Sequence, residues 1–482
     1  MVGIDAISYY VPQLYLSIED LAKLRNIEYA KLNKGLGLHR MAVPDMNEDA
    51  ASFAANALLR LIRDNNINPK EIGRVYLGTE SALDASKPTA TYAIEAVEDA
   101  LQNDSQERLF SNCDVVDMTF ACIGAVDALQ NCLDWVRANP SRKAVVIASD
   151  VSKYELNSTG EYTQGAGAVA VLVTANPSIL TIDDQWGIGT KSEGDFFKPR
   201  RTFTKNAILE DLVANLDLRY SKEQVEELLN ASNSEFWTDP SKKYELFKEE
   251  PVFDGQFSNQ CYSDRITEAF AHFQKETAVN YLEDWQHLVF HLPYAYHGRR
   301  IIYRNWIDWL NNSGKIENLY AEIGHPEESD PKQWKRSAVK SELYKEFINS
   351  KIAPSELASS EIGNMYTASI FMSLLSLLAN SVDHDIDLGN ETIGFIAYGS
   401  GSKSKVFQGQ VVDNYQNKIK EIKLFEALNS RKGIDIETYE AIHTSALDQQ
   451  VAQNEAITIS HVETDENIRG LRKYKLQSWT KL

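Results

Sequence analysis

Residues 114–124 read Asp-Val-Val-Asp-Met-Thr-Phe-Ala-Cys-Ile-Gly, an apolar run followed by small residues around Cys122. The apolar run predicts a buried β-strand over residues 114–118. After Cys122, apolar residues recur at the spacing of one helix face, at Val126, Leu129, Leu133 and Val136, before Pro140 closes the segment. The stretch therefore predicts a strand, a turn and a helix, with Cys122 at or near the helix amino terminus.

Other short apolar runs share this pattern, namely residues 74–78, 144–148, 288–290 and 393–397. Each reaches a polar or glycine-rich turn and then a helical pattern, which is typical of a parallel sheet in an α/β protein. Open α/β sheets bind their ligands at the carboxyl ends of the strands. The polar residues that follow these strands, including Glu80, Asp150 and His291, are therefore candidates for a functional site.

Composition narrows the functional classes. The chain has 482 residues and a formal net charge of −20. A nucleic-acid or anionic-membrane partner needs Lys and Arg to neutralise its phosphates, so this acidic composition argues against both. No apolar stretch approaches the roughly 20 residues that span a bilayer, and no signal-peptide pattern is visible. We expect a cytoplasmic protein of two or more structural units.

Cysteine and histidine spacing predicts free thiols and no metal. The four cysteines, Cys113, Cys122, Cys132 and Cys261, include no CxxC pair, and no HExxH sequence is present. The run Tyr398-Gly-Ser-Gly-Ser-Lys-Ser404 differs from a phosphate-binding loop, because serine stands where that motif needs glycine before lysine. We therefore exclude an NTPase.

Three residues can carry covalent chemistry. A helix amino terminus stabilises a thiolate, which favours Cys122 as a nucleophile. Glu80 would suit proton transfer if burial raises its pKa, and His291 stands between apolar residues after a strand. Each also has a plainer interpretation: Cys122 as a small core residue, Glu80 as a solvated carboxylate and His291 as a satisfied core histidine.

Eight segments make a combined pattern, and they are spread along the chain in this order: 78–87 (GTESALDASK), 120–124 (FACIG), 148–150 (ASD), 195–199 (DFFKP), 253–262 (FDGQFSNQCY), 290–294 (FHLPY), 363–367 (GNMYT) and 398–401 (YGSG). They resemble, in order, the motifs of the hydroxymethylglutaryl-CoA synthase family of the thiolase superfamily. The resemblance implies an α/β thiolase-like fold, with two similar βαβαβαββ halves in five α/β/α/β/α layers, and a homodimer.

The resemblance also implies a reaction and roles. Cys122 matches the nucleophile that takes an acetyl group from acetyl-CoA, Glu80 matches the general acid/base, and His291 matches the residue that positions and polarises the carbonyl of acetoacetyl-CoA. The CoA thioesters are substrates, and no cofactor is implied. Residues matching groups that tune or line the substrate site are Asp84, Asp150, Asp195, Asn364, Tyr366 and Ser400.

Three departures from the family pattern concern the substrate site. Ile123 replaces the aromatic residue common after the nucleophile, and Tyr296 replaces a basic residue after the histidine motif. Residues 200–252 intervene where many relatives have a short connection. The basic residues that can instead hold CoA phosphates are Lys198, Arg200, Arg201, Arg299 and Arg300.

We predict four segments: an amino-terminal thiolase-like half with the nucleophile (1–177), a charged insertion or lid (178–250), a carboxyl-terminal half (251–410) and an extension (411–482). The basic end of the extension, residues 469–481, is expected to be a solvated tail or surface helix.

Two alternative functions stay open at this point. One is the β-branching synthase of polyketide assembly, which acts on carrier-protein-bound acyl groups. The other is an inactive acyl-CoA-binding scaffold. A synthase of the mevalonate pathway, condensing acetyl-CoA with acetoacetyl-CoA, is the leading expectation.

Overall fold

The computed structural model describes residues 1–101, 107–215, 221–231, 236, 243–328, 330–453 and 455–477. It contains two compact units, one made of residues 1–195 with 255–482 and the other of residues 196–254. The two units are described separately.

The first unit contains one large mixed sheet and three smaller ladders. The large sheet has the strand order β14-β15-β16-β8-β1-β7-β6-β4-β5, and β9 also pairs with β16. Its strands are β1 (Val2–Tyr10), β4 (Ile72–Gly78), β5 (Asp114–Met118), β6 (Lys143–Ser152), β7 (Gly165–Ala175), β8 (Leu180–Ile182), β9 (Gly187–Thr190), β14 (His287–Phe290), β15 (Thr392–Gly399) and β16 (Lys403–Val411). All five strands expected from the sequence are present, and β4 pairs in parallel with both β5 and β6.

The helices of the first unit lie in the segments that connect its strands. They are α1 (Ile18–Leu24), α2 (Tyr29–Leu36), α3 (Ala50–Asp64), α4 (Thr89–Leu101), α5 (Gly124–Ala138), α9 (Gly255–Glu276), α10 (Tyr281–Asp284), α11 (His297–Ile301), α12 (Tyr303–Asn312), α13 (Ile316–Ile323), α14 (Pro331–Ala338), α15 (Glu342–Lys351), α16 (Ala353–Ile362), α17 (Ser369–Asp383), α18 (Gln416–Ile419), α19 (Leu424–Asn429) and α20 (Ile436–His443).

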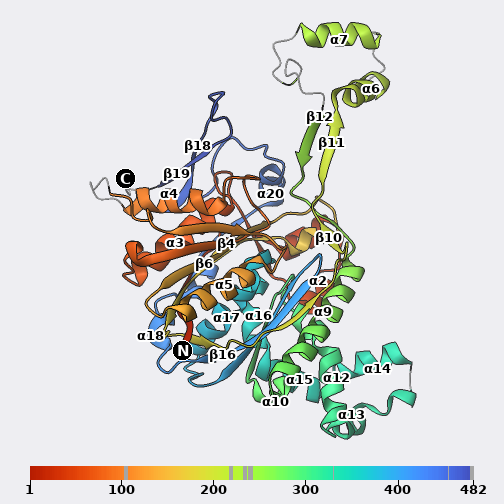
Figure 1. Cartoon of the computed structure of the whole chain (residues 1–482). Helices are drawn as coiled ribbons and strands as arrows, with labels where there is room; N and C mark the ends of the chain where they lie inside the picture. Colours follow the sequence, from red (N-terminus) through yellow and green to blue (C-terminus); the bar gives the residue numbers. More distant parts are fainter. Residues whose placement is uncertain are drawn as a thin grey trace. The chain divides into compact units, whose positions relative to one another are not determined.

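Alternating side chains of the strands build the layers. Val75 and Leu77 of β4 pack with α3 and α4, whereas Tyr76 belongs to the core with α5 and α17. On β15, Phe395 packs with that same central core, whereas Ile396 packs on the α9 side. The order is helices, strands, helices, strands, helices, as the ribbon shows for α3, β6, α5, β16 and α9 (Figure 1). This confirms the thiolase-like α/β fold.

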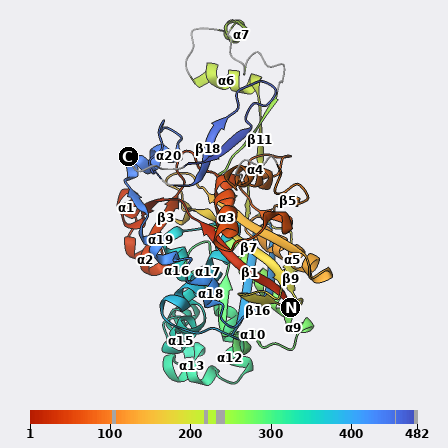
Figure 2. The same cartoon turned by 90° about the vertical axis from the view of Figure 1, so that its left-hand side faces the viewer.

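The carboxyl-terminal extension contributes strands to the first unit. β17 (Lys432–Ile434) pairs in parallel with β2 (Leu14–Ser17), which pairs with β3 (Arg40–Val43). β18 (Ile457–Val462) and β19 (Arg472–Leu476) form a hairpin whose strands lie near α3 and α4 (Figure 2).

The expectation of a solvated tail or surface helix over residues 469–481 is therefore wrong for its described part. Tyr474 of β19 is buried, and its hydroxyl donates a hydrogen bond to Asp49 at 2.7 Å. Arg472 also pairs with Asp49 at 2.5 Å. An apolar face and a partly buried ion pair outweigh the local basic composition here. Residues 478–481 lie outside the described residues.

The described residues of the second unit, residues 196–254, include two short ladders and the helices α6 and α7. β10 (Phe196–Phe197) pairs with β13 (Val252–Phe253), and β11 (Arg200–Thr204) pairs with β12 (Lys243–Phe247). α6 spans Lys205–Asn215 and α7 spans Lys222–Asn230, the latter begun by a capping box at Ser221. The insertion was predicted to begin at residue 178, but the second unit begins later. The intervening strands β8 and β9 belong to the large sheet, and both are too short to give a clear sequence signal.

Candidate active site

Cys122 lies in a tight turn between β5 and α5. The preceding Ala121 has a φ of 37°, in the left-handed region, and α5 begins two residues after Cys122. A Cβ at Gly124 would lie 2.5 Å from the Met118 carbonyl oxygen, so the turn closes only with glycine there. Cys122 is 8% exposed, and its predicted place at a helix amino terminus is confirmed.

Glu80 faces the sulfur of Cys122. Its Oε1 atom lies 3.0 Å from Cys122 Sγ. The end of β4 packs directly on the start of α5, since a Cβ at Gly78 would lie 2.1 Å from the main-chain nitrogen of Ala125. This close approach brings the turn after β4 beside the turn before α5. The structure therefore brings together two residues that the sequence placed after separate strands.

Asp150 fixes the turn that carries Glu80. It lies in β6 and is fully buried. Its Oδ1 accepts hydrogen bonds from the Thr79 hydroxyl at 2.9 Å and from the Glu80 main-chain N–H at 2.8 Å. Its Oδ2 accepts one from the Thr367 N–H at 3.0 Å. A buried carboxylate with three donors holds the three segments in one geometry.

His291 follows β14 and is also buried. Its Nδ1 lies 2.5 Å from the hydroxyl oxygen of Ser369, which accepts a further hydrogen bond from the Leu292 N–H at 3.2 Å. The Tyr262 hydroxyl donates to the His291 carbonyl oxygen at 2.9 Å. Burial lowers the pKa of His291 to about 3, so its ring is neutral at pH 7.

The two halves of the fold meet at the nucleophile. A Cβ on Gly399, the last residue of β15, would lie 2.7 Å from Cγ2 of Ile123, the residue after Cys122. Burial, and after it the charge of Cys122, raises the pKa of Tyr262, whose ring stacks beside His291 with 6.1 Å between centroids. The turn that carries Cys122 thus packs directly against the end of β15.

Asp195 organises the turn after β15. This fully buried carboxylate accepts hydrogen bonds from the Tyr398 hydroxyl at 2.7 Å and the Gly401 N–H at 2.9 Å, and from the Ser258 hydroxyl at 3.2 Å. Ser400 lies within the same turn, half-buried. The structure therefore joins Asp195 with the predicted glycine-rich segment.

Asn364 and Tyr366 form a second strained turn at the site. Asn364 is buried, and its Oδ1 accepts a hydrogen bond from the Tyr366 N–H at 2.8 Å. Tyr366 has a φ of 43° and is buried. Burial, followed by the charges of Tyr154 and Glu80, raises the pKa of Tyr366.

Tyr154 was missed by the sequence reasoning. Its ring is buried, and burial, followed by the charges of Cys122 and Glu80, raises its pKa. The only signal in the sequence was its position shortly after the Ala-Ser-Asp150 motif.

Asp84 lies in the exposed loop after Glu80. Its Oδ1 accepts hydrogen bonds from the N–H groups of Ser86 and Lys87, both at 2.7 Å, and these lower its pKa. The carboxylate therefore shapes its own turn.

Comparison with known proteins identifies the family. The profile for hydroxymethylglutaryl-coenzyme A synthase N terminal matches residues 1–178, and the profile for its C terminal matches residues 226–466. The chain belongs to the hydroxymethylglutaryl-CoA synthase family. It is an enzyme of that family, with the thiolase-like fold that the resemblance predicted.

Relatives match this family member along nearly its whole length. Hydroxymethylglutaryl-CoA synthase of Haloferax volcanii is 28% identical over 456 residues, which cover 92% of this chain and 91% of that protein. The synthase of Enterococcus faecalis is 29% identical and covers 94% of both chains. A solved structure, MvaS in complex with 3-hydroxy-3-methylglutaryl coenzyme A, is 26% identical, with a TM-score of 0.75 over 99% of both chains.

A basic cavity in this family member is lined in part by residues that follow His291 in the chain. It has a volume of about 610 Å³, and the cations that line it are Lys34, Arg299, Arg300, Lys332, Lys335, Arg336 and Lys345. Arg299 pairs with buried Glu356 through both Nε and Nη2. Arg300 instead donates hydrogen bonds to the Gly35 carbonyl at 2.8 Å and the Tyr294 hydroxyl at 3.3 Å. A concentration of positive charge on an acidic chain suits a phosphorylated ligand.

The other predicted basic residues lie in the second unit. Lys198 stands between β10 and β11, and Arg200 and Arg201 belong to β11. Arg200 lies 3.4 Å from Glu245 of β12.

Among the described residues, no cluster of three or more His, Cys, Asp or Glu side chains is placed to hold a metal ion. Within the same residues, no helix has the length and apolar character needed to cross a membrane.

Proposed function

We propose that this enzyme condenses acetyl-CoA with acetoacetyl-CoA to give 3-hydroxy-3-methylglutaryl-CoA and CoA, as a synthase of the mevalonate pathway. The observation that carries this proposal is the 3.0 Å contact between Cys122 Sγ and Glu80 Oε1 in a member of this family. No cofactor or metal enters the proposed reaction.

Acylation comes first. The Cys122 thiolate attacks the acetyl-CoA carbonyl, the bond between that carbon and the CoA sulfur breaks, and CoA leaves as the thiol after taking a proton. The helix amino terminus behind Cys122 supplies partial positive charge for the thiolate. The strained turn at Ala121 holds the sulfur at the surface of the site.

Condensation needs Glu80. Its carboxylate takes a proton from the methyl group of acetyl-Cys122, and the resulting carbon nucleophile forms a bond to the ketone carbon of acetoacetyl-CoA. Glu80 returns the proton to the alkoxide that forms there. Water then hydrolyses the thioester to Cys122, which frees the product carboxylate and the thiol.

His291 orients and polarises the acceptor. Because its ring is neutral at pH 7, it acts on the ketone as a hydrogen-bond donor rather than as a cation. Its contact with Ser369 at 2.5 Å fixes the orientation of the ring.

The basic cavity supports free CoA thioesters as substrates. CoA carries a 3′-phosphate and a diphosphate, whereas a carrier-protein prosthetic group has one phosphodiester. Seven cationic side chains line the cavity. This number exceeds what a single phosphodiester requires. We assign Arg300 to a phosphate, because its described hydrogen bonds go to neutral oxygens, whereas Arg299 already pairs with Glu356.

The edge strand β5 supports a homodimer. It is the last strand of the large sheet, and its side chains from Val115 to Met118 are half-buried within the single chain. A half-apolar sheet edge is stabilised by pairing with a second copy. Sedimentation or light scattering should give twice the mass of 54.4 kDa, and a monomer would contradict this part of the proposal.

Mass spectrometry tests the proposed function. Enzyme mixed with acetyl-CoA should gain about 42 Da on the peptide containing Cys122, with none on the peptides of the other cysteines, because only that thiol is placed for acyl transfer. Acetoacetyl-CoA should then discharge the acetyl-enzyme and release the condensation product. Acetylation that is unchanged in Cys122→Ser, or that occurs only from an acyl carrier protein, would overturn the proposal.

A further inference from the structure

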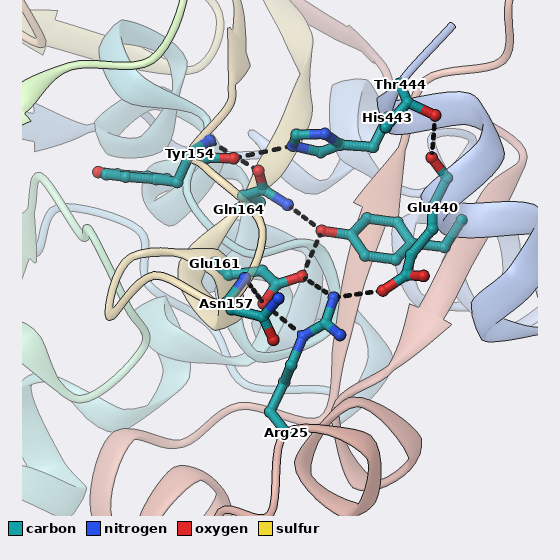
Figure 3. A network of polar contacts seen from close by, with 9 residues as sticks. Arg25, Tyr154, Asn157, Glu161, Gln164, Glu440, His443 and Thr444 are labelled. Atoms are coloured by element: carbon teal, nitrogen blue, oxygen red, sulfur yellow. Dashed lines mark hydrogen bonds and ion pairs between the residues drawn. The ribbon is translucent and has the colours of Figure 1, made fainter. Parts of the chain in front are cut away.

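A buried polar network surrounds the connection between β6 and β7 (Figure 3). We call residues 153–164 the Tyr154 segment. Glu161 of this segment is 1% exposed, and its carboxylate pairs with Arg25, which follows α1, through contacts of 2.9 and 2.8 Å. The Asn157 N–H also donates to Glu161 at 2.9 Å. The Asn157–Glu161 hydrogen bond therefore closes the Tyr154 segment on itself, and the ion pair connects the segment to Arg25.

Helix α20, from the carboxyl-terminal extension, contacts the same segment. The Tyr439 hydroxyl donates to Glu161 at 3.1 Å and accepts a hydrogen bond from Gln164 Nε2 at 2.7 Å. Glu440 forms an ion pair with Arg25, with 2.6 Å between Glu440 Oε1 and Arg25 Nη2. The extension is thus connected by hydrogen bonds to a loop that lies more than 270 residues earlier.

The network ends on the main chain of Tyr154. Its N–H donates to Gln164 Oε1 at 2.7 Å, and its carbonyl oxygen accepts a hydrogen bond from His443 Nε2 at 2.8 Å. Side chains therefore hold both main-chain polar groups of this residue. Figure 3 shows the Tyr154 ring pointing away from Gln164 and His443.

The Tyr154 ring occupies a defined place. It lies flat against Gly160, where an added Cβ would meet the ring at 2.2 Å. Tyr154 lies two residues after β6, and the end of β6 is held against the Glu80 turn: Asp150 accepts the Glu80 N–H at 2.8 Å, and Val151 exchanges hydrogen bonds with the Ser81 hydroxyl at 3.1 and 3.2 Å. Burial, followed by the charges of Cys122 and Glu80, raises the pKa of Tyr154. The ring is therefore on the side of the catalytic pair, while the main chain is on the side of α20.

We infer that His443 and Tyr439 of α20, with Arg25 and Glu161, are positioning residues that hold the Tyr154 hydroxyl beside Cys122 and Glu80. The inference rests on the proposed function for its catalytic consequence. The connection gives the carboxyl-terminal extension a role at the active site. A misplacement of about 1 Å in such a site can reduce turnover about a hundredfold.

The test uses His443→Ala, which removes the donor to the Tyr154 carbonyl, and His443→Gln, which can restore an N–H donor. Thr444→Ala is the matched control, because Thr444 caps the carboxyl end of α20 and its described hydroxyl hydrogen bonds go to the carbonyl oxygens of Glu440 and Ala441 in that helix. Two rates are measured in the full-length enzyme: condensation turnover, and alkylation of Cys122 by iodoacetamide at fixed pH, followed by peptide mass mapping.

His443→Ala should lower turnover by about tenfold with little change in the KM for acetyl-CoA, since misplaced groups act mainly on the chemical step. It should also change the Cys122 alkylation rate. His443→Gln should recover most of both rates, and Thr444→Ala should match the wild type.

A double-mutant cycle with Tyr154→Phe separates positioning from general destabilisation. If His443 acts through the Tyr154 hydroxyl, His443→Ala should have little further effect on either rate once that hydroxyl is removed. Equal effects of His443→Ala with Tyr154 and with Phe at that position would overturn the inference. If the wild type forms no condensation product, the proposed function fails, while the alkylation cycle still tests the positioning.

Discussion

The sulfur of Cys122 lies 3.0 Å from Oε1 of Glu80, although the two residues are 42 positions apart in the chain. The contact depends on backbone packing, because the end of β4 meets the start of α5 at Gly78 and Ala125. It also depends on Asp150, whose carboxylate holds the Glu80 turn. Each of these dependencies leads to an experiment.

Gly78→Ala should separate β4 from α5. The new Cβ would lie 2.1 Å from a main-chain nitrogen, which no rotamer change can relieve. Overpacking of this kind costs about 1–3 kcal/mol, so urea denaturation should show a loss in that range, with a fall in condensation. Gly194→Ala is the control, since its Cβ meets nothing within 4 Å. Wild-type stability and activity in Gly78→Ala would contradict the packing argument.

Asp150→Asn should release the Glu80 turn. An amide nitrogen would face either the Thr79 and Glu80 donors or the Thr367 N–H, leaving at least one buried donor without an acceptor. A lost buried hydrogen bond costs roughly 1–3 kcal/mol, and condensation should fall at least about tenfold as Glu80 moves.

The comparison for Asp150→Asn is Asp134→Asn, because Asp134 is an exposed carboxylate on α5. This substitution should leave the unfolding free energy and turnover near wild type. Activity of Asp150→Asn equal to that of this control would show that the network does not position Glu80.

His291 should make the fold sensitive to acid. Its pKa is about 3 in the folded state, below the ordinary value of 6.5, so the unfolded chain binds more protons between those values. Unfolding free energy therefore falls as the pH drops below about 6.5, by about 2 kcal/mol at pH 5 from this group. His291→Gln should lose less stability between pH 7 and pH 5 than the wild type in urea titrations. Identical pH slopes would show that His291 is not buried in its neutral form.

Arg300→Ala should weaken binding of CoA thioesters. A hydrogen bond to a charged group contributes roughly 1.5–3 kcal/mol, so the KM for acetyl-CoA should rise about tenfold or more. The wild-type KM should also rise with salt. Arg304→Ala is the matched control, because Arg304 pairs with Asp264 and is not among the residues lining the basic cavity.

The 3′-phosphate can be tested directly with 3′-dephospho-acetyl-CoA, which should have a higher KM than acetyl-CoA in the wild type. The penalty should shrink in variants of the cationic residue that contacts that phosphate. Equal KM values for the two thioesters would remove the argument for free CoA over a carrier protein.

Sequence alone located the strands of the site because each is a short apolar run that ends in a distinctive turn. It therefore anticipated that Cys122 lies at or near a helix amino terminus and that Glu80 and His291 follow strands. It could not show the 3.0 Å contact, which depends on how closely Gly78 lets β4 approach α5.

Long-range hydrogen bonds were the main features that the sequence did not reveal. Tyr154 is an ordinary tyrosine after a strand, and its partners Gln164 and His443 become visible only when α20 folds back onto the segment. Residues 472–476 have a basic composition that suggested solvent exposure, but Tyr474 and the pairing with β18 bury one face. Local composition carries no information about such distant partners.

The measurement that tests the central claim most directly is the reaction of Glu80→Ala with acetyl-CoA and then with acetoacetyl-CoA. Acylation needs only the thiolate, so acetyl-Cys122 should form and accumulate in this variant. Condensation needs the base, and a positioned acid/base contributes about 10²–10⁴-fold, so product formation should fall at least about a hundredfold. Condensation by Glu80→Ala at a rate near that of the wild type would contradict the division of labour between Cys122 and Glu80.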